Sequence, residues 1–513
     1  MKIQVTKNTI QGSFWGIICK LTAIVLPFVI RTIIIRKLGA EYAGLNGLFS
    51  SILQILNLAE LGIDSAMVFE MYKPVAEDDY SVLSSLLNFY RKAYLVIGSA
   101  VTIVGLSLIP FLRYLISGSV PSDINIYVLY LIYLFNSVSG YFFFAFYLSI
   151  LFAYQRQADS SKIYFCIYLL TYVAQIIVLL VFKNYYLYVS FLPLATFLYN
   201  FIVSLFVKKR YPNIRPVGRI SDENKKSIKK RVIALAVNKF GVLIPHTVDV
   251  IVISSFLGLF LVTKYDNYYY VLNSVVGIIL ILFNSLTAGL GNKLIKSTIQ
   301  ENTKDFSLIF SINGLIAIVC TTCLFSLYQD FIELWVGSEY LFSIQMVVLF
   351  CVNFYLHVIQ KTVCVYRDAS GMWKEVMAKT LVASILNLVL DIVLVRFFGV
   401  FGVIVPTILC MLFIDVPWEA HVLFKSKIKY PIFNYFARIL FYAFITVMSC
   451  VVCNKIVYNL GIMNVVLKML VTLALSLIIS LGLFCAFTSF FEDNVSSLMA
   501  FFKERIPFLT KKK

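Results

Sequence analysis

Long apolar runs alternate with short polar segments along almost the whole chain. A run of about 20 apolar residues is long enough to cross a bilayer as a helix. The sequence contains fourteen such runs, which predicts an all-α polytopic membrane protein with about 14 transmembrane helices. The expected spans are residues 13–36, 43–70, 88–117, 125–153, 162–182, 185–207, 232–256, 268–292, 307–328, 341–365, 377–398, 402–424, 434–456 and 464–490.

The second of these runs carries a regular polar pattern. A polar residue recurs there every three or four positions, and at 100° per residue the set falls within an arc of about 120° on one helix face. The members of this polar stripe are Asn46, Ser50, Gln54, Asn57, Glu60 and Asp64. Because a stripe with two carboxylates is costly in hydrocarbon, we expect this helix to face protein or water and to line a pathway.

The composition supports a membrane protein. The chain of 513 residues is 60% hydrophobic and only 14% charged, and a soluble protein could not bury so much apolar surface. The ten cysteines lie mostly inside apolar runs without CxxC pairs, so we expect buried thiols rather than a metal site or disulfides. The first apolar run is too long for a signal peptide and contains Lys20 and Arg31, so we expect an uncleaved span.

Basic residues concentrate in alternate loops. If the N-terminus is cytoplasmic, these loops and the C-terminal tail hold most Lys and Arg, while the opposite side holds acids such as Asp123 and Asp330. The positive-inside rule therefore predicts that both termini are cytoplasmic. This accounts for much of the formal net charge of +18. Because the charges are spread over loops on one side, nucleic-acid binding is not expected.

The longest polar segment, residues 208–231, separates the sixth span from the seventh. It contains ten basic and two acidic residues. Two interpretations stay open. The segment could bind anionic lipid headgroups or a cytoplasmic partner, or it could be a basic cytoplasmic linker between two six-span bundles.

The second bundle partly repeats the first. The sequence YAGLN at residues 42–46 resembles YYVLN at residues 269–273, and a second asparagine follows eleven residues later in both copies, at Asn57 and Asn284. An even number of spans in each half predicts parallel repeats related by an axis along the membrane normal. Such an arrangement is typical of transporters whose site lies between two rocking bundles.

The same residues carry a resemblance to a known family. The block LGAEYAGLNGLFSSILQILNLAELGIDSAM at residues 38–67 is followed by YKP and LLNFYRKAY, and span 7 ends in DVIVISSFLG. These blocks resemble polysaccharide-biosynthesis flippases of the O-antigen type, which belong to the multidrug/oligosaccharidyl-lipid/polysaccharide exporter superfamily. The resemblance covers about the first 300 residues, and the C-terminal third agrees in topology.

The resemblance implies a fold and an activity. It implies two six-helix lobes around a V-shaped cavity, residues 1–207 and 232–427, joined by the linker 208–231 and followed by two additional helices and a basic tail in residues 428–513. The implied activity is translocation of an undecaprenyl-pyrophosphate-linked oligosaccharide across the bacterial cytoplasmic (inner) membrane by alternating access. The implied partners are this lipid-linked glycan, membrane lipids, a glycan polymerase and glycosyltransferases, and no cofactor is expected.

Span 1 offers cations for a diphosphate. An anionic cargo inside the membrane requires positive charge together with neutral polar groups. Arg31 is the first candidate ligand and Lys20 the second, because eleven residues return a helix to nearly the same face, and Pro27 between them would kink the helix. The alternative is that either side chain extends to the membrane interface.

Span 2 offers neutral contacts for a glycan. We expect Asn46, Gln54 and Asn57 to bind the cargo, and Asn273 and Asn284 to be their counterparts in the second bundle. Glu60 and Asp64 could pair with the span 1 cations when the cavity is empty and so act in coupling or gating. Alternatively, these carboxylates hold the hairpin of spans 1 and 2 together through buried hydrogen bonds.

Span 7 offers a further polar face. Asn238, His246 and Asp249 share one side of the helix near the break expected at Pro245, and Lys239 is another candidate contact for the cargo. A membrane carboxylate beside a broken helix could hold Na⁺ or a proton and couple transport to an ion gradient. A structural network is the alternative.

Three further acids lie in or near later spans. Asp391 and Arg396 are expected to form a pair within their helix or at the interface, and Asp415 and Glu419 are additional acids without an assigned partner.

Other functions remain as alternatives. A multidrug antiporter shares the implied fold, but its usual cationic cargo favours an acidic cavity without well-placed Lys and Arg. A lipid II flippase is closer, because its cargo also carries a diphosphate. A membrane glycan polymerase generally needs a sizeable outer loop, whereas the outer loops here are short. The sequence contains no nucleophile triad, metal spacing or P-loop, so an enzyme is not expected.

Overall fold

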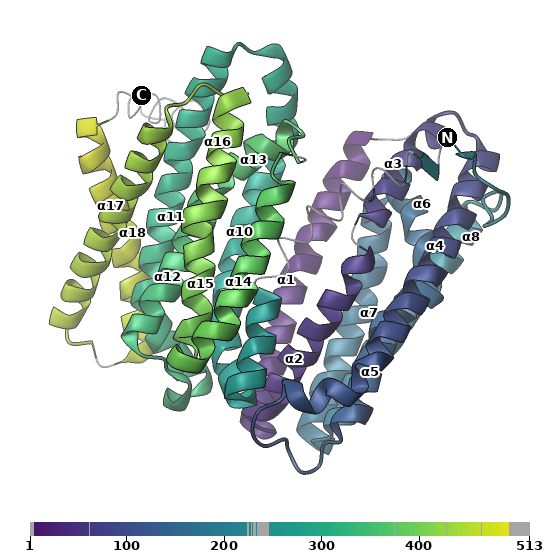
Figure 1. The fold of residues 1–513 in the computed structure, drawn as a ribbon, viewed down its shortest axis with the longest axis horizontal. Helices are drawn as coiled ribbons and strands as arrows, with labels where there is room; N and C mark the ends of the chain where they lie inside the picture. The colour runs from purple at the N-terminus through teal and green to yellow at the C-terminus, as the bar shows by residue number, and fades with distance from the viewer. Residues whose placement is uncertain are drawn as a thin grey trace, which may run out of the picture. The chain divides into compact units, whose positions relative to one another are not determined.

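In the computed structural model, the described residues are 5–60, 62–222, 225, 226, 228, 232, 246–373, 375–426, 428–462 and 464–491. Regular secondary structure in this part of the chain is entirely helical (Figure 1). The predicted all-α membrane protein is therefore confirmed. Asn238 and Lys239 lie outside the described residues, as do parts of the segment 208–231 and most of the C-terminal tail.

In chain order the helices are α1 (Val5–Lys37), α2 (Ala40–Leu56), η1 (Asn57–Glu60), α3 (Ile63–Ala76), α4 (Tyr80–Ser107), η2 (Ile109–Leu115), α5 (Ile126–Phe142), η3 (Ala145–Tyr147), α6 (Leu148–Ala153), α7 (Gln157–Ile177), η4 (Val178–Phe182), α8 (Tyr185–Arg210), the helix His246–Leu257, α10 (Leu259–Lys296), α11 (Ile299–Val336), η5 (Ser338–Tyr340), α12 (Ile344–Ile359), α13 (Lys361–Ala369), α14 (Met377–Phe398), α15 (Phe401–Cys410), η6 (Met411–Asp415), α16 (Val416–Ser426), α17 (Ile432–Asn459) and α18 (Val465–Phe491).

The number of unbroken spans is smaller than the number of apolar runs. Eleven described helices are long and apolar enough to cross a membrane, or twelve if the bent pair Ile126–Phe142 and Ala145–Ala153 is one span. The predicted span 2 is broken between α2 and α3, and span 7 is described only from His246 onward. These two runs account for the difference between the fourteen expected spans and the twelve that the described residues can form.

Local sequence sets several helix boundaries. Asp79 precedes α4 and its carboxylate accepts hydrogen bonds from the backbone N–H groups of Ser81 and Val82. Thr298 begins α11 in a capping box with Glu301. Such side chains satisfy the N–H groups that the first helical turn leaves without a partner.

The break in span 2 has a backbone cause. Gly62 adopts φ 99°, a left-handed conformation that disfavours residues with a side chain. It follows the short 3₁₀ helix η1, and α3 begins at the next residue. The polar stripe is therefore distributed over three short helices instead of one.

The chain divides into two compact units. Unit 1 comprises Met1–Thr263 with Val395–Val400, and unit 2 comprises Lys264–Leu394 with Phe401–Lys513. In unit 1, α1 packs against α7, α5 against α8, and α3 against α6. The lobes expected at residues 1–207 and 232–427 stay a prediction.

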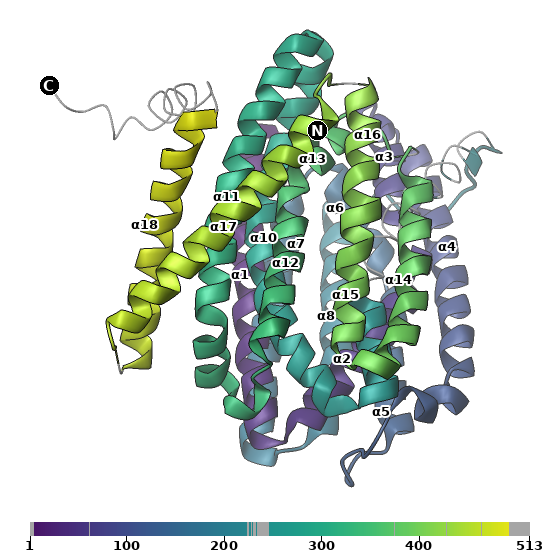
Figure 2. The same cartoon turned by 60° about the vertical axis from the view of Figure 1, so that its left-hand side comes forward.

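Unit 2 is organised around α11. The helices α17 and α18 pack against α11 and against each other (Figure 2). A Cβ built on Gly314 of α11 would lie 2.5 Å from the ring of Tyr442 on α17, so only glycine allows this approach. Lys468 of α18 forms an ion pair of 2.8 Å with Asp330 of α11. The two C-terminal helices are therefore part of the packed unit.

Candidate functional site

The two predicted cations of span 1 lie on one continuous helix. Lys20 is exposed and Arg31 is half-buried. Nη2 of Arg31 donates a hydrogen bond of 3.2 Å to the carbonyl oxygen of Thr263. Eleven residues of α-helix rise about 16 Å, which exceeds the size of a diphosphate. Each of these long side chains can cover part of this distance, so joint contact of Lys20 and Arg31 with one diphosphate stays a prediction.

Asn46 begins the polar stripe inside unit 1. Its Oδ1 accepts a hydrogen bond of 2.6 Å from the hydroxyl of Tyr133 on α5. The hydroxyls of Tyr133 and Tyr185 are 3.3 Å apart, and Tyr185 donates to the carbonyl oxygen of Tyr42. Asn46 is thus connected through tyrosines to the backbone at the start of its own helix.

Gln54 connects span 2 with span 7. Its Oε1 accepts a hydrogen bond of 3.0 Å from the hydroxyl of Thr247, which lies on the helix His246–Leu257. Asp249 lies on the same helix and its side chain is fully buried, while His246 is half-buried. Two parts of the sequence-predicted site therefore lie next to each other in unit 1.

The middle of the stripe is held by hydroxyls from α5. Oδ1 of Asn57 accepts from the hydroxyls of Ser137 at 2.8 Å and Tyr141 at 3.1 Å. Tyr141 also lies 2.6 Å from Oε2 of Glu60. One tyrosine hydroxyl thus lies between an amide and a carboxylate of the stripe.

The end of the stripe is held by two tyrosines of α4. The hydroxyl of Tyr94 lies 2.8 Å from Oε1 of Glu60 and 2.5 Å from Oδ1 of Asp64. The hydroxyl of Tyr90 contacts Asp64 and lies 2.8 Å from the hydroxyl of Tyr94. The two carboxylates are thereby joined through tyrosine hydroxyls where the helix is broken.

Most side chains of the stripe therefore contact polar groups of neighbouring helices in unit 1, although Ser50, Gln54 and Asp64 are exposed, and the sequence did not reveal these partners. The partners are mainly tyrosines: Tyr90, Tyr94, Tyr133 and Tyr141. A partial signal was available, because residues four apart, such as Tyr90 and Tyr94, share a helix face. The contacts of Asn57, Glu60 and Asp64 fit a structural role for these side chains as well as a functional one.

The expected counterparts in the second bundle are less informative. Asn273 lies on α10 in unit 2 and its side chain is exposed. Asn284 is on the same helix, but its side chain is outside the described residues.

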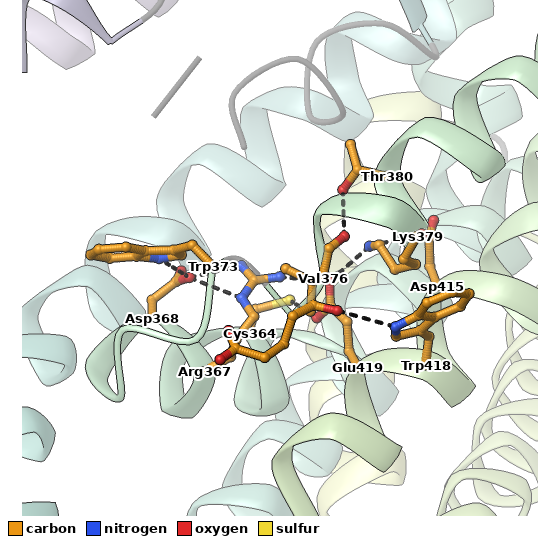
Figure 3. A network of polar contacts seen from close by, with 11 residues as sticks. Cys364, Arg367, Asp368, Trp373, Val376, Lys379, Thr380, Asp415, Trp418 and Glu419 are labelled. Carbon is orange, nitrogen blue, oxygen red and sulfur yellow. Dashed lines mark hydrogen bonds and ion pairs between the residues drawn. The ribbon is translucent and has the colours of Figure 1, made fainter. Parts of the chain in front are cut away.

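Unit 2 contains an ion network that the sequence did not predict (Figure 3). The carboxylate of Glu419 on α16 is buried and receives three donors. These are Nη1 of Arg367 at 2.6 Å, Nζ of Lys379 at 2.8 Å and Sγ of Cys364 at 3.0 Å. Glu419, to which the sequence assigned no partner, is therefore the centre of a cluster.

The ion network extends from Glu419 in two directions. Nζ of Lys379 lies 2.8 Å from Asp415, the last residue of the π-helix η6. The guanidinium of Arg367 contacts Asp368, which also accepts a hydrogen bond of 3.1 Å from the indole of Trp373. The ion network joins α13, the start of α14, η6 and α16 (Figure 3).

The predicted pairing of Arg396 was wrong. Its guanidinium lies 5.3 Å from the ring centre of Phe256, in a cation–π contact. Residues five apart in a helix point about 140° away from each other, which explains why Asp391 is not its partner. Asp391 is fully buried, and Asn387 donates a hydrogen bond of 3.3 Å to it.

A resident metal site is not evident in the described part of the chain. No group of three or more His, Cys, Asp and Glu side chains there could hold a metal ion. The cysteines in this part of the chain are free thiols.

Comparisons with known proteins identify the fold. No protein-family model and no curated protein sequence matches the chain. Among solved structures, lipid II flippase MurJ in an inward closed conformation matches with a TM-score of 0.63 and 15% identity, covering 94% of this chain and 99% of the flippase.

Multidrug transporters share the same fold. A multidrug resistance MATE family transporter of the MOP superfamily, inward-facing, matches with a TM-score of 0.59 and 14% identity over 80% of this chain and 99% of its own. The Vibrio cholerae MATE transporter VcmN in a bent form matches with a TM-score of 0.54 and 11% identity over 86% and 98%. The chain therefore has the fold of these membrane transporters.

Proposed function

We propose that this protein is a flippase for an undecaprenyl-pyrophosphate-linked oligosaccharide in the bacterial cytoplasmic membrane. In this proposal it works by alternating access, with both termini in the cytoplasm, and receives cargo made by glycosyltransferases and used by a glycan polymerase. The observation that carries the proposal is the combination of Arg31 with the hydrogen-bonded polar stripe in unit 1. A cation and a series of neutral polar groups suit a cargo with a diphosphate and many hydroxyls.

The extent of the structural matches favours a flippase over a multidrug antiporter. The flippase structure covers 94% of this chain, whereas the two MATE structures cover 80% and 86%. The part of this chain that each MATE structure does not cover is similar in length to residues 428–513. These residues contain α17 and α18. A multidrug antiporter stays the less favoured alternative.

Substitution of Arg31 tests the proposal. Arg31→Ala should abolish export of the surface glycan at unchanged protein level in the membrane, because the cation for the diphosphate is lost. Arg31→Lys is the matched control and should retain part of the export, since it keeps the charge. Normal export by the alanine variant would contradict the assignment of Arg31.

A lipid II flippase is the second candidate, because one of the similar solved structures is a lipid II flippase. A translocation assay with the purified protein in liposomes distinguishes these two candidate functions. The proposal requires faster translocation of an undecaprenyl-pyrophosphate oligosaccharide lacking the lipid II peptide than of lipid II itself. The reverse preference would favour the second candidate.

We also propose that the buried carboxylate of Asp249 couples transport to Na⁺ or H⁺. The carboxylate is fully buried on the helix that donates to Gln54 of the polar stripe. Asp249→Asn should remove the dependence of transport in liposomes on the sodium or pH gradient. An unchanged dependence would exclude Asp249 from coupling.

A further inference from the structure

The first half of the basic segment 208–231 is folded against unit 1. The ring of Tyr211 stacks on that of Tyr154 with centroids 4.3 Å apart. Ile214 and Ile220 are buried, with exposed fractions of 1% and 7%. Residues 211–221 therefore form a docked element and not a free tether.

This element is attached to the first turns of α4. The backbone N–H of Arg215 donates to Oγ of Ser84 at 3.1 Å, and Nδ2 of Asn88 donates to the carbonyl oxygen of Gly218 at 2.8 Å. Gly218 has φ +90° and lies close to Ser85, where a Cβ would be 3.4 Å from that side chain. The turn therefore lies directly on the surface of α4.

A pocket of about 500 Å³ lies between the docked element and α4. We call it the linker pocket. Its lining residues with polar side chains are Tyr80, Ser81, Ser84, Ser85, Asn213, Arg219 and Ser221. The pocket is thus bordered by many hydrogen-bond donors and one permanent cation.

Several of these donors have no acceptor in the protein. The side chains of Arg219, Asn213 and Ser81 form no hydrogen bond or ion pair with any residue that the structure describes. The nearby carboxylate of Asp79 is already engaged by two backbone N–H groups of α4. The N-terminus of α4 is therefore already capped. A phosphate group that enters the pocket would accept hydrogen bonds from side chains and not from these backbone N–H groups.

The linker pocket also lies at the ends of two candidate membrane-spanning helices, Tyr80–Ser107 and Tyr185–Arg210. Its lining residues belong to the first turns of α4, which begins at Tyr80, and to residues 213–221, which follow the end of α8 at Arg210 in the chain. The last turn of α8 holds Lys208, Lys209 and Arg210. Basic side chains at the end of a membrane helix attract anionic lipid headgroups.

We propose that the linker pocket binds the phosphate group of an anionic phospholipid. The Arg219 guanidinium can donate two parallel hydrogen bonds to phosphate oxygens, and the hydroxyl of Ser81 and the amide of Asn213 add neutral donors. A bound headgroup would contact α4 and the docked element at the same time. It would thereby hold residues 211–221 in place at the beginning of the connection that leads to the helix His246–Leu257.

Binding of short-chain lipids to the full-length protein in detergent tests the proposal. The probes are dioctanoyl-phosphatidylglycerol, dioctanoyl-phosphatidylcholine and inorganic phosphate, with Kd measured for each. We expect saturable binding of phosphatidylglycerol that is at least tenfold tighter than binding of the other two probes. Equal affinity for phosphatidylcholine, equal affinity for inorganic phosphate, or no saturable binding of phosphatidylglycerol would overturn the proposal.

Two matched substitutions separate a specific site from general basicity. Arg219→Gln should weaken phosphatidylglycerol binding at least tenfold. Lys225→Gln removes the same charge six residues away, but that ammonium already forms an ion pair of 2.6 Å with Asp222 and lowers the pKa of its carboxyl through this hydrogen bond. The affinity of this control variant for phosphatidylglycerol should stay within twofold of that of the unmodified protein. An equal loss of affinity in both variants would overturn the proposed site.

Asn213→Ala provides a second, charge-neutral test. Because Asn213 is exposed and forms no hydrogen bond with the described residues, its replacement should not affect folding. We expect at least a threefold weaker binding of phosphatidylglycerol with an unchanged thermal midpoint. Unchanged binding of phosphatidylglycerol would contradict a contact between Asn213 and the headgroup.

Discussion

Tyrosine hydroxyls provide most of the hydrogen bonds to the polar stripe. The carboxylates of Glu60 and Asp64 contact the hydroxyls of Tyr90, Tyr94 and Tyr141. A phenol hydroxyl donates a hydrogen bond without adding a second charge, while its ring packs among apolar side chains. This arrangement gives neutral partners to the carboxylates of the half-buried Glu60 and the exposed Asp64 among otherwise apolar helices.

Removal of one such hydroxyl should reduce stability. Tyr94→Phe leaves Glu60 and Asp64 with one donor fewer, and we expect a loss of about 1–3 kcal/mol in the free energy of unfolding. Tyr164→Phe is the control, because the Tyr164 hydroxyl has no hydrogen-bond partner in the described part of the chain. Denaturant titration in micelles measures both, and equal stabilities would contradict a role for the Tyr94 hydroxyl.

The ion network of unit 2 gives a second prediction for single residues. Glu419→Gln removes a buried charge and leaves Arg367 and Lys379 with less compensation, so we expect a loss of about 3–5 kcal/mol. Asp368→Asn alters the same network where the side chain is 40% exposed, and should cost only about 0–1 kcal/mol. Thermal unfolding of the purified variants should rank them in this order, and the reverse order would contradict the central role of Glu419.

The helices of span 2 show how an element can depart from its hydrophobic pattern. The run 43–70 is apolar enough for one helix, yet Gly62 in a left-handed conformation separates α2 from α3. The break lies at the two carboxylates, so the tyrosines of α4 and α5 can approach both of them. Broken helices inside a membrane require partners for the freed polar groups, and here side chains of neighbouring helices surround the break.

Glycine contacts between elements predict a specific packing defect. A Cβ added at Gly44 of α2 would lie 2.4 Å from the carbonyl oxygen of Leu259, a backbone atom that cannot rotate away. Gly44→Ala should therefore separate α2 from the start of α10 and cost about 1–3 kcal/mol. Gly140→Ala is the control, since no atom lies within 4 Å of the added Cβ. If Gly44→Ala were as stable as this control, the close approach would be refuted.

For the whole molecule, the alternation of basic loops makes the topology testable. We expect a fluorescent protein fused after Lys513 to be fluorescent in the cytoplasm. A cysteine replacing Ser119, in the loop between η2 and α5, should react with an impermeant maleimide from outside in a cysteine-free background. Labelling of this loop only after membrane permeabilisation would reverse the predicted orientation.

The sequence alone determined the class and the helical composition of this protein. Apolar runs of about 20 residues allow no other structure, because the bilayer offers no partner for backbone groups except those within the helix itself. The spacing of Asn46, Gln54 and Asn57 likewise indicated which face of span 2 would be polar, since helical periodicity is a local property.

Only the tertiary structure decided which groups meet. The contact of Gln54 with Thr247 joins residues 193 positions apart, and the ion network joins Arg367 to Glu419 across 52 positions. Apolar helices in a bilayer can pack in many registers with similar burial, so hydrophobic pattern does not specify neighbours. The docking of residues 211–221 likewise depended on contacts with α4, and tyrosines of α4 set the environment of Asp64.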